Sequence, residues 1–166
     1  MNISYKWLKQ YLNIDLSPEE LKDKLTFSGI EVEAVHSSDS LLDKIVVAEI
    51  KQKEIHPNSD HLSVCQVFDG IETVQVVCGA PNCAAGQKVA FARVGTQLGD
   101  FSIKKAKLRG VESFGMICSE KELEISDNHD GIMILPEDAK TGITLADHLN
   151  ISDTVYEEEI TPNRPD

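Results

Sequence analysis

The stretch of the chain that decides the fold lies at residues 62–77 and reads LSVCQVFDGIETVQVV. Two short runs rich in strand-forming residues, Leu62–Phe68 and Thr73–Val77, flank the pair Asp69-Gly70. A short connection with Asp-Gly favours a β-hairpin, because glycine adopts the positive φ that tight hairpin turns need. The stretch therefore predicts two antiparallel strands.

Similar runs, separated by turn residues, lie on both sides of this hairpin. We expect further principal strands at Ile45–Ile55, Val89–Ala92 and about Ser102–Leu108, a short helix at Ser119–Leu123 and a short strand at Ile132–Leu135. Five principal strands within about a hundred residues are typical of an OB-fold, a five-stranded Greek-key barrel. The central part of the chain is therefore predicted to be a small closed β-structure.

Two helices and a strand are predicted before this barrel. The first helix is indicated by apolar residues that recur at helical spacing: Ile3, Trp7, Leu8, Tyr11 and Leu12. In the second, Ser17 is an N-cap serine, Pro18 suits the first helical position and Glu20 completes a capping box. Gly29 ends this helix, and Ile30–Val35 then alternates apolar and acidic residues like a half-exposed strand.

The barrel is expected to interrupt a second, smaller domain. Residues 154–160 again have a strand-like pattern, and a Pro-containing turn at 161–166 follows. Pairing of this tail with Ile30–Val35 makes the barrel an insertion. We predict residues 1–39 as the first part of a split α+β domain, residues 40–150 as the OB-fold domain and residues 151–166 as the truncated start of the second part. The fold class is mainly β with α+β flanks, in a chain expected to be a fragment of a longer protein.

Composition excludes several classes of protein. The 166 residues include 16 Lys or Arg and 28 Asp or Glu, which gives a net charge of −12. No apolar run approaches the roughly 20 residues that span a bilayer, and the start of the chain lacks the continuous apolar segment of a secretory signal. We therefore expect a cytoplasmic protein with no membrane partner.

The four cysteines stand at positions 65, 78, 83 and 118, without C-x-x-C spacing. This spacing argues against a disulfide framework or a zinc ribbon and predicts reduced thiols. A zinc site that combines Cys78 and Cys83 with His56 or His61 is the less favoured alternative.

Catalytic patterns are weak in this sequence. Cys118, His129 and Asp130 have the residue types of a cysteine nucleophile and its base, but a buried thiol and a loop histidine explain them better. No glycine-rich phosphate-binding loop is present. We expect no catalytic and no metal-binding residues in the chain.

One basic segment stands out from the acidic background. Residues 100–110 carry four positive charges and one negative charge, a net +3 that leaves −15 on the rest of the chain. On a strand, Lys105, Lys107 and Arg109 would share one face with Ile103, while Ala106 and Leu108 would face the core. Such a row suits the phosphates of a nucleic acid, and Phe101 and Phe114 beside it could stack on bases. The alternative is a solvated edge whose lysines prevent strand aggregation.

The segment that follows, residues 110–120, combines glycines with small polar side chains. Gly110 and Gly115 would let a ligand approach the backbone closely. Ser119 could cap the short helix predicted after it. Each of these residues taken singly is more often structural.

Several motifs together carry a resemblance that covers the whole chain in order. They are SYKWL at 4–8, GIEVE at 29–33, HPNSDHL at 56–62, VCGAPN at 77–82, KAKLRGVESFGMICSE at 105–120, LPED at 135–138 and ITPNRPD at 160–166. The chain resembles the N-terminal part of bacterial phenylalanyl-tRNA synthetase beta subunits, including their inserted tRNA-binding domain of the endothelial-monocyte-activating-polypeptide type. The resemblance implies an OB barrel over roughly residues 40–150.

In that family the ligase is a heterotetramer of two alpha and two beta subunits. The resemblance implies that the alpha subunit carries the aminoacylation site, with ATP and magnesium, and that further beta-subunit domains act beside it. Neither cofactor nor active site is implied for the present chain. The implied partners are tRNA, the alpha subunit and the remaining beta-subunit domains.

The motif match also implies which residues face RNA. They are Lys105, Lys107, Arg109, Ser113, Met116 and Ser119, with Asn82 as a weaker member. Cys83 departs from the aliphatic residue expected at its position and has no functional interpretation. The alternative to tRNA binding is an assembly role, in which the cations pair with an acidic surface of a neighbouring domain or stay solvated.

Overall fold

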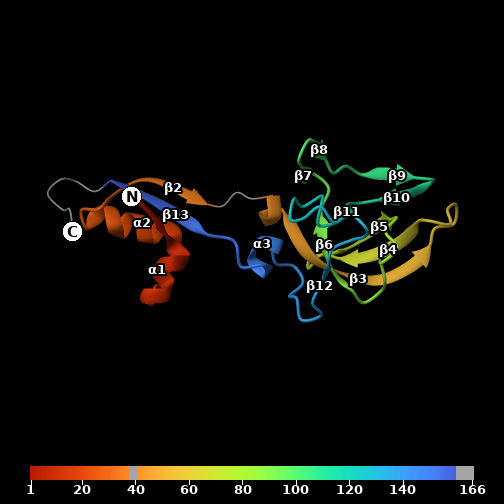
Figure 1. Ribbon diagram of the computed structural model, residues 1–166, viewed down its shortest axis with the longest axis horizontal. Coiled ribbons are helices and arrows are strands. Elements are labelled where there is room, and N and C mark those ends of the chain that lie inside the picture. The colour runs from red at the N-terminus through yellow and green to blue at the C-terminus, as the bar shows by residue number, and fades with distance from the viewer. Residues whose placement is uncertain (38–40, 160–166) are drawn as a thin grey trace. The chain divides into compact units, whose positions relative to one another are not determined.

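The computed structural model describes residues 1–37 and 41–159 (Figure 1). The chain forms two units, one of residues 1–39 with 152–166 and one of residues 40–151. The boundary predicted at 39/40 and the turn predicted at 161–166 lie outside the described residues. Each unit has its own core.

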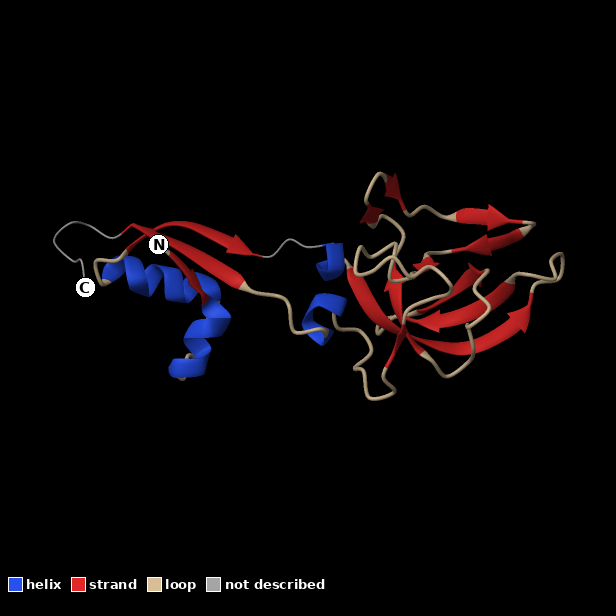
Figure 2. Ribbon diagram, in the orientation of Figure 1, coloured by secondary structure: helices blue, strands red, loops and turns tan. Residues whose placement is uncertain are grey.

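The larger unit is mainly β (Figure 2). Its principal strands are β3 (Ile45–Ile55), β4 (Ser63–Phe68), β5 (Thr73–Cys78) and β6 (Lys88–Ala92). Shorter elements complete it: η1 (Leu41–Asp43), β7 (Gln97–Leu98), β8 (Phe101–Ser102), β9 (Ala106–Leu108), β10 (Val111–Ser113), β11 (Met116–Ile117), β12 (Ile134–Leu135) and α3 (Leu145–His148).

Antiparallel pairing gives the strand order β11-β6-β3-β4-β5, with β12 also on β6. The long strand β3 pairs with β6 through its first half and with β4 through its second, with a register shift between Ile50 and Gln52. Bonds between the β10 end and β5 approach closure, since Phe114 N donates to the Gln75 carbonyl at 2.8 Å. The result is a nearly closed five-strand antiparallel barrel, consistent with the predicted OB-like fold.

Both faces of the first half of β3 are covered, which explains its unbroken apolar run. Val46, Ala48 and Ile50 join a core cluster with Phe91. Ile45 and Val47 point the other way, into a second cluster that includes Leu145 of α3. Burial on both faces favours a continuous Ile/Val/Ala run over an alternating one.

Three predicted elements of the barrel are wrong in detail. The strand expected at 102–108 is two short strands, β8 and β9, because the Ile103 backbone bonds to Gly95 and Thr96 at 2.7 and 2.8 Å. Ser119–Leu123 forms a single turn, closed by a 3.3 Å bond between Leu123 N and the Ser119 carbonyl, instead of a helix. The strand expected at Ile132–Leu135 shortens to β12.

The smaller unit contains β1 (Asn2–Ser4), α1 (Tyr5–Tyr11), α2 (Pro18–Phe27), β2 (Glu31–Ser37) and β13 (Thr154–Glu159). Its sheet has the order β1-β13-β2, so the predicted pairing of the tail with the 30–35 strand is confirmed, with Tyr156 opposite Val35. Tyr156 packs with Leu21 and Val32 to form the core.

Serine N-caps set the start of both helices of this unit. In α2 the Ser17 hydroxyl accepts from Glu20 N at 3.2 Å and Glu20 Oε2 accepts from Ser17 N at 2.8 Å, which confirms the predicted capping box. The first helix begins later than its apolar spacing suggests, because Ile3 pairs with Tyr156 in β1 and Ser4 is the N-cap. In the described ranges, no helix is long and apolar enough to cross a membrane.

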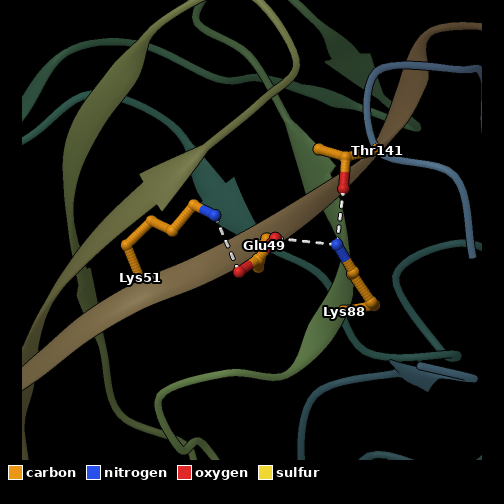
Figure 3. A network of polar contacts seen from close by, with 4 residues as sticks. All are labelled: Glu49, Lys51, Lys88 and Thr141. Atoms are coloured by element: carbon orange, nitrogen blue, oxygen red, sulfur yellow. Dashed lines mark hydrogen bonds and ion pairs between the residues drawn. The ribbon is translucent and has the colours of Figure 1, made fainter. Parts of the chain in front are cut away.

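A polar network ties β3 to β6 (Figure 3). The Glu49 carboxylate accepts from Lys51 Nζ at 2.8 Å and from Lys88 Nζ at 2.7 Å. Lys88 Nζ also donates to the Thr141 hydroxyl at 2.8 Å. The hydrogen bonds from Lys51 and then Lys88 lower the pKa of Glu49 from its ordinary value.

Candidate nucleic-acid interface

The predicted cations lie on a small hairpin, residues 105–113, which we call the basic hairpin. β9 and β10 pair with Leu108 opposite Val111 and Lys107 opposite Glu112. The two residues between them, Arg109 and Gly110, have φ of +47° and +94°. Positive φ at both central positions is the type I′ geometry, whose twist matches that of a two-residue hairpin.

The three cations do not form the single strand row that alternation predicts. Lys105 precedes β9 and Arg109 lies in the turn. Ile103 is buried instead of sharing their face, and Leu108 is 41% exposed instead of facing the core. The hairpin nevertheless presents the cations, because the side chains of β9 lie outside the barrel core.

Lys105 has one acidic and one aromatic neighbour. Its Nζ lies 2.9 Å from the Glu112 carboxylate, with both side chains about half exposed. The same ammonium lies 4.8 Å from the centre of the Phe114 ring. Exposed ion pairs contribute only about 0–1 kcal/mol, so a phosphate can compete for this lysine.

A groove of about 550 Å³ opens beside the hairpin. Its lining includes three of the predicted residues, Ser113, Met116 and Ser119. Residues of the 79–81 and 129–132 segments form other parts of its wall. The groove also has charged or titratable side chains in its wall that the sequence did not assign to an RNA-binding surface, namely Lys104, Glu122, His129 and Asp130.

The two serines of the groove are already engaged within the protein. Ser113 Oγ accepts from Val77 N at 3.0 Å and donates to the Gly115 carbonyl at 3.2 Å. Ser119 donates from its hydroxyl and its backbone N to Glu122 Oε2 at 2.8 and 2.6 Å. These bonds hold the two serines in the shape of the groove, and Met116 adds an apolar side chain to its lining.

Asn82 supports one wall of the groove through hydrogen bonds to the backbone of Ile132. Its Nδ2 donates to the Ile132 carbonyl and its Oδ1 accepts from Ile132 N, both at 2.9 Å. These bonds join the loop after β5 to the 129–132 segment, fifty residues further along the chain. Asn82 is placed as a support for the wall and is not among the groove-lining residues.

The cysteines and the histidine considered as catalytic or zinc-binding candidates are packed or hydrogen-bonded within the barrel. Cys65, Cys78 and Cys83 are buried in the barrel core, with 3.4 Å between the sulfurs of Cys65 and Cys83. Cys118 is fully buried, and burial raises the pKa of its thiol to about 12. His56 bonds to the backbone of Leu108 and Asn58. Among residues 1–37 and 41–159, no group of three or more His, Cys, Asp or Glu side chains is arranged to hold a metal ion.

Comparison with known proteins identifies a family whose model matches this part of the chain. Residues 45–144, which include the hairpin and much of the groove, match the family model described as "Putative tRNA binding domain". The whole chain is 50% identical over 167 residues to the phenylalanine–tRNA ligase beta subunit of Geobacter metallireducens, and 52% identical over 175 residues to that of Bacteroides fragilis. It spans 21% of the length of each.

A solved structure, a MetRS related protein from Pyrococcus horikoshii, is 20% identical with a TM-score of 0.45, covering 79% of this chain and 98% of that one. The family match covers well over half of the chain and includes each of the three cations of the basic hairpin. The chain therefore belongs to the family of tRNA-binding domains.

Proposed function

We propose that this chain is the tRNA-binding module of a phenylalanine–tRNA ligase beta subunit and supports the attachment of phenylalanine to its tRNA. The observation that carries the proposal is the position of the basic hairpin and the groove within the matched residues 45–144. The likeness of the full chain to beta subunits supports the choice of ligase.

The proposed contacts are to phosphate and to RNA shape. Lys105, Lys107 and Arg109 offer cationic groups to the backbone, and such contacts position a nucleic acid without reading its sequence. Ser113, Met116 and Ser119 contribute through the form of the groove. Asn82 acts indirectly by fixing the 129–132 wall. The module adds affinity and leaves the choice of amino acid to other parts of the ligase.

The aminoacylation step belongs to the proposed parent, a heterotetramer of two alpha and two beta subunits in the cytoplasm. That reaction consumes ATP and uses magnesium, and we assign both to the alpha subunit. The described residues include neither a phosphate-cradling loop nor a metal-ligand cluster that would fit these groups. No step through ATP or magnesium is assigned to this chain.

A second candidate function is assembly of the ligase. The smaller unit exposes large apolar side chains that suit packing against another protein surface: Trp7 is 50%, Tyr11 69% and Phe27 92% exposed. Under this alternative the barrel is a scaffold, and the basic hairpin remains solvated or pairs with an acidic neighbour. The two functions differ in whether the cations of the basic hairpin contribute to tRNA binding.

Fluorescence anisotropy of labelled tRNA over a salt series distinguishes them. About three phosphate contacts predict a log–log salt slope of roughly −2 to −3. The slope should largely disappear in the triple variant that combines Lys105→Ala, Lys107→Ala and Arg109→Ala. The matched control, Lys22→Ala, Lys24→Ala, Lys140→Ala, removes the same net charge elsewhere and should keep most of the slope. Absence of binding at low salt, by a protein that circular dichroism shows to be folded, would favour the assembly role.

A further inference from the structure

The loop that follows β3 grips the tip of the basic hairpin. His56 Nε2 lies 3.0 Å from the Leu108 carbonyl, and His56 Nδ1 accepts from Asn58 N at 3.0 Å. Because Nδ1 is an acceptor, Nε2 carries the proton and donates to Leu108. One fully buried imidazole therefore joins a loop residue to a hairpin residue 52 positions away.

Asn58 makes a reciprocal contact with the hairpin turn. Its side-chain Nδ2 donates to the Arg109 carbonyl at 3.0 Å, and Arg109 Nη1 donates to the Asn58 carbonyl at 3.3 Å. Arg109 is a non-glycine residue at a φ of +47°. The left-handed region is unfavourable for L-residues and persists where the surroundings over-determine it. The two bonds supply that constraint.

The gripping loop is itself rigid. His56 N donates to the Leu62 carbonyl at 3.0 Å, and Ser59 N donates to the His56 carbonyl at 3.2 Å. Both ends of the loop continue into β3 and β4, which pair along six registered positions. We call residues 56–59 the latch, since they connect this well-packed part of the barrel to the turn.

The latch complements the attachment on the other side of the hairpin. The β10 strand is held to β5, where Gln75 Nε2 donates to the Glu112 carbonyl at 2.8 Å and Val77 N donates to Ser113 Oγ at 3.0 Å. The β9 strand and the turn, which carry Lys107 and Arg109, meet the latch instead. Holding both edges prevents the short hairpin from swinging away from the barrel.

We propose that the latch sets the position of the phosphate-binding cations, and that His56 and Asn58 are positioning residues for tRNA binding. This inference rests on the proposed function. A hairpin already held in its bound geometry loses little conformational entropy when it meets RNA, so preorganisation increases affinity. The latch changes no charge on the hairpin and therefore alters affinity without changing the number of phosphate contacts.

The test separates affinity from salt dependence. Asn58→Ala removes the exposed hydrogen bond from Asn58 Nδ2 to the Arg109 carbonyl. It should weaken tRNA binding about three- to tenfold, which corresponds to the net free energy of roughly one hydrogen bond. Its log–log salt slope should stay that of the wild type. Lys107→Ala should lower the affinity and reduce the slope by about one unit. Gln97→Ala, which removes the hydrogen bond from Gln97 Nε2 to the Gly99 carbonyl within the neighbouring β7–β8 hairpin, is the control and should bind like the wild type.

A double-mutant cycle tests whether the latch acts through the cations. In a Lys107→Ala, Arg109→Gly background, where glycine keeps the turn, Asn58→Ala should change binding less than twofold. Amide hydrogen exchange should accelerate at 106–113 in Asn58→Ala while β4 and β5 keep their protection. His56→Gln serves as a second variant and should show both effects.

The outcomes distinguish the latch from the function on which it rests. A wild type without salt-dependent tRNA binding overturns the proposed function, and the positioning role falls with it. Salt-dependent binding that Asn58→Ala and His56→Gln leave unchanged overturns the latch alone. An equal loss from Asn58→Ala in both backgrounds also contradicts it, because the residue would then act independently of the cations.

Discussion

The wall of the barrel, strands β3 to β6, and the basic hairpin are neighbouring β-structures built on opposite principles. In the wall, Ile45–Ala48 and Val89–Ala92 are buried residue after residue. In the hairpin, every residue of β9 is exposed. The wall gains stability from apolar burial, whereas the hairpin buries little and depends on attachments at β5 and the latch.

This contrast separates two properties of the molecule. Burial of apolar area is the main favourable contribution to folding, so stability should follow the wall. Charge presented to solvent should determine binding to RNA and follow the hairpin. Substitutions in one region are then expected to leave the property of the other largely unchanged.

Removal of the largest fully buried side chain of the wall should have the largest effect. Phe91 is 1% exposed and belongs to the principal core cluster. Phe91→Ala should lower the free energy of unfolding by about 3–5 kcal/mol, the usual cost of emptying a buried aromatic site. Urea denaturation followed by circular dichroism measures this loss.

Phe101→Ala is the control, because Phe101 is 51% exposed at the edge of β8. Its stability should stay within about 0.5 kcal/mol of the wild type. The separation of properties is refuted if the folded fraction of Phe91→Ala binds tRNA with an altered salt slope.

The junction between the two regions should be nearly as sensitive. Gly115 follows the hairpin with a φ of +134°, and a methyl group there would meet the Phe91 ring and lie 2.7 Å from the Ala92 carbonyl oxygen. Gly115→Ala should cost about 1–3 kcal/mol for the strained backbone and about 1–3 kcal/mol for overpacking. Thermal or urea unfolding gives the total.

Gly86→Ala isolates the backbone contribution. Gly86 has a φ of +88° with no atom within 4 Å of an added methyl group, so only the first of the two costs should remain. Because the added methyl group meets the Phe91 ring, the loss in stability of the Phe91→Ala, Gly115→Ala double variant should be smaller than the sum of the two single losses. Equal losses for the two glycine variants would remove overpacking from the explanation.

The wall could be predicted from sequence because each of its strands is a local pattern. Ile45–Ile55 has the same bounds in the prediction and in the structure, and the 62–77 stretch forms the expected hairpin. Its connection is longer than the Asp-Gly pair, since β4 and β5 are separated by residues 69–72. β-branched runs and turn residues carry this information without knowledge of distant partners.

The hairpin and the groove were less predictable because distant contacts determine them. Alternation across 102–108 assumes one strand, but the Ile103 backbone pairs with Gly95 and Thr96. The partners of Asn82 and His56 lie about fifty residues away. Motif resemblance selected Ser113, Met116 and Ser119, and the structure brings all three to one groove. Their contact with RNA stays a prediction.

Two carboxylates that pair with lysines, one on the hairpin and one on the wall, are expected to have smaller effects. On the hairpin, Glu112 lies opposite Lys107 and 2.9 Å from Lys105. Glu112→Gln removes the carboxylate that competes with phosphate, so tRNA affinity should rise about two- to fivefold, equivalent to a surface ion pair. The salt slope should become steeper, while the urea midpoint stays close to that of the wild type. Weaker binding by this variant would mean that Glu112 orders the lysines for RNA.

The corresponding pair on the wall is expected to affect stability alone. Glu49→Gln breaks the bond to Lys88 that joins β3 to β6 and the bond to Lys51 within β3 (Figure 3), and should cost about 0.2–1 kcal/mol at neutral pH. Because these bonds lower the pKa of Glu49 from 4.5, their stabilisation is present above that value and is lost as pH falls through the lowered pKa.

Urea titrations between about pH 7 and pH 3 should therefore show a constant stability difference between wild type and Glu49→Gln near neutral pH that narrows as pH falls below 4.5. The tRNA affinities of the two proteins at neutral pH should agree within about twofold, because Glu49 lies on the wall and not on the hairpin. A difference in stability that persists unchanged to pH 3 would assign the loss to packing instead of charge. A large change in tRNA affinity would show that phosphate contacts extend from the hairpin onto the wall.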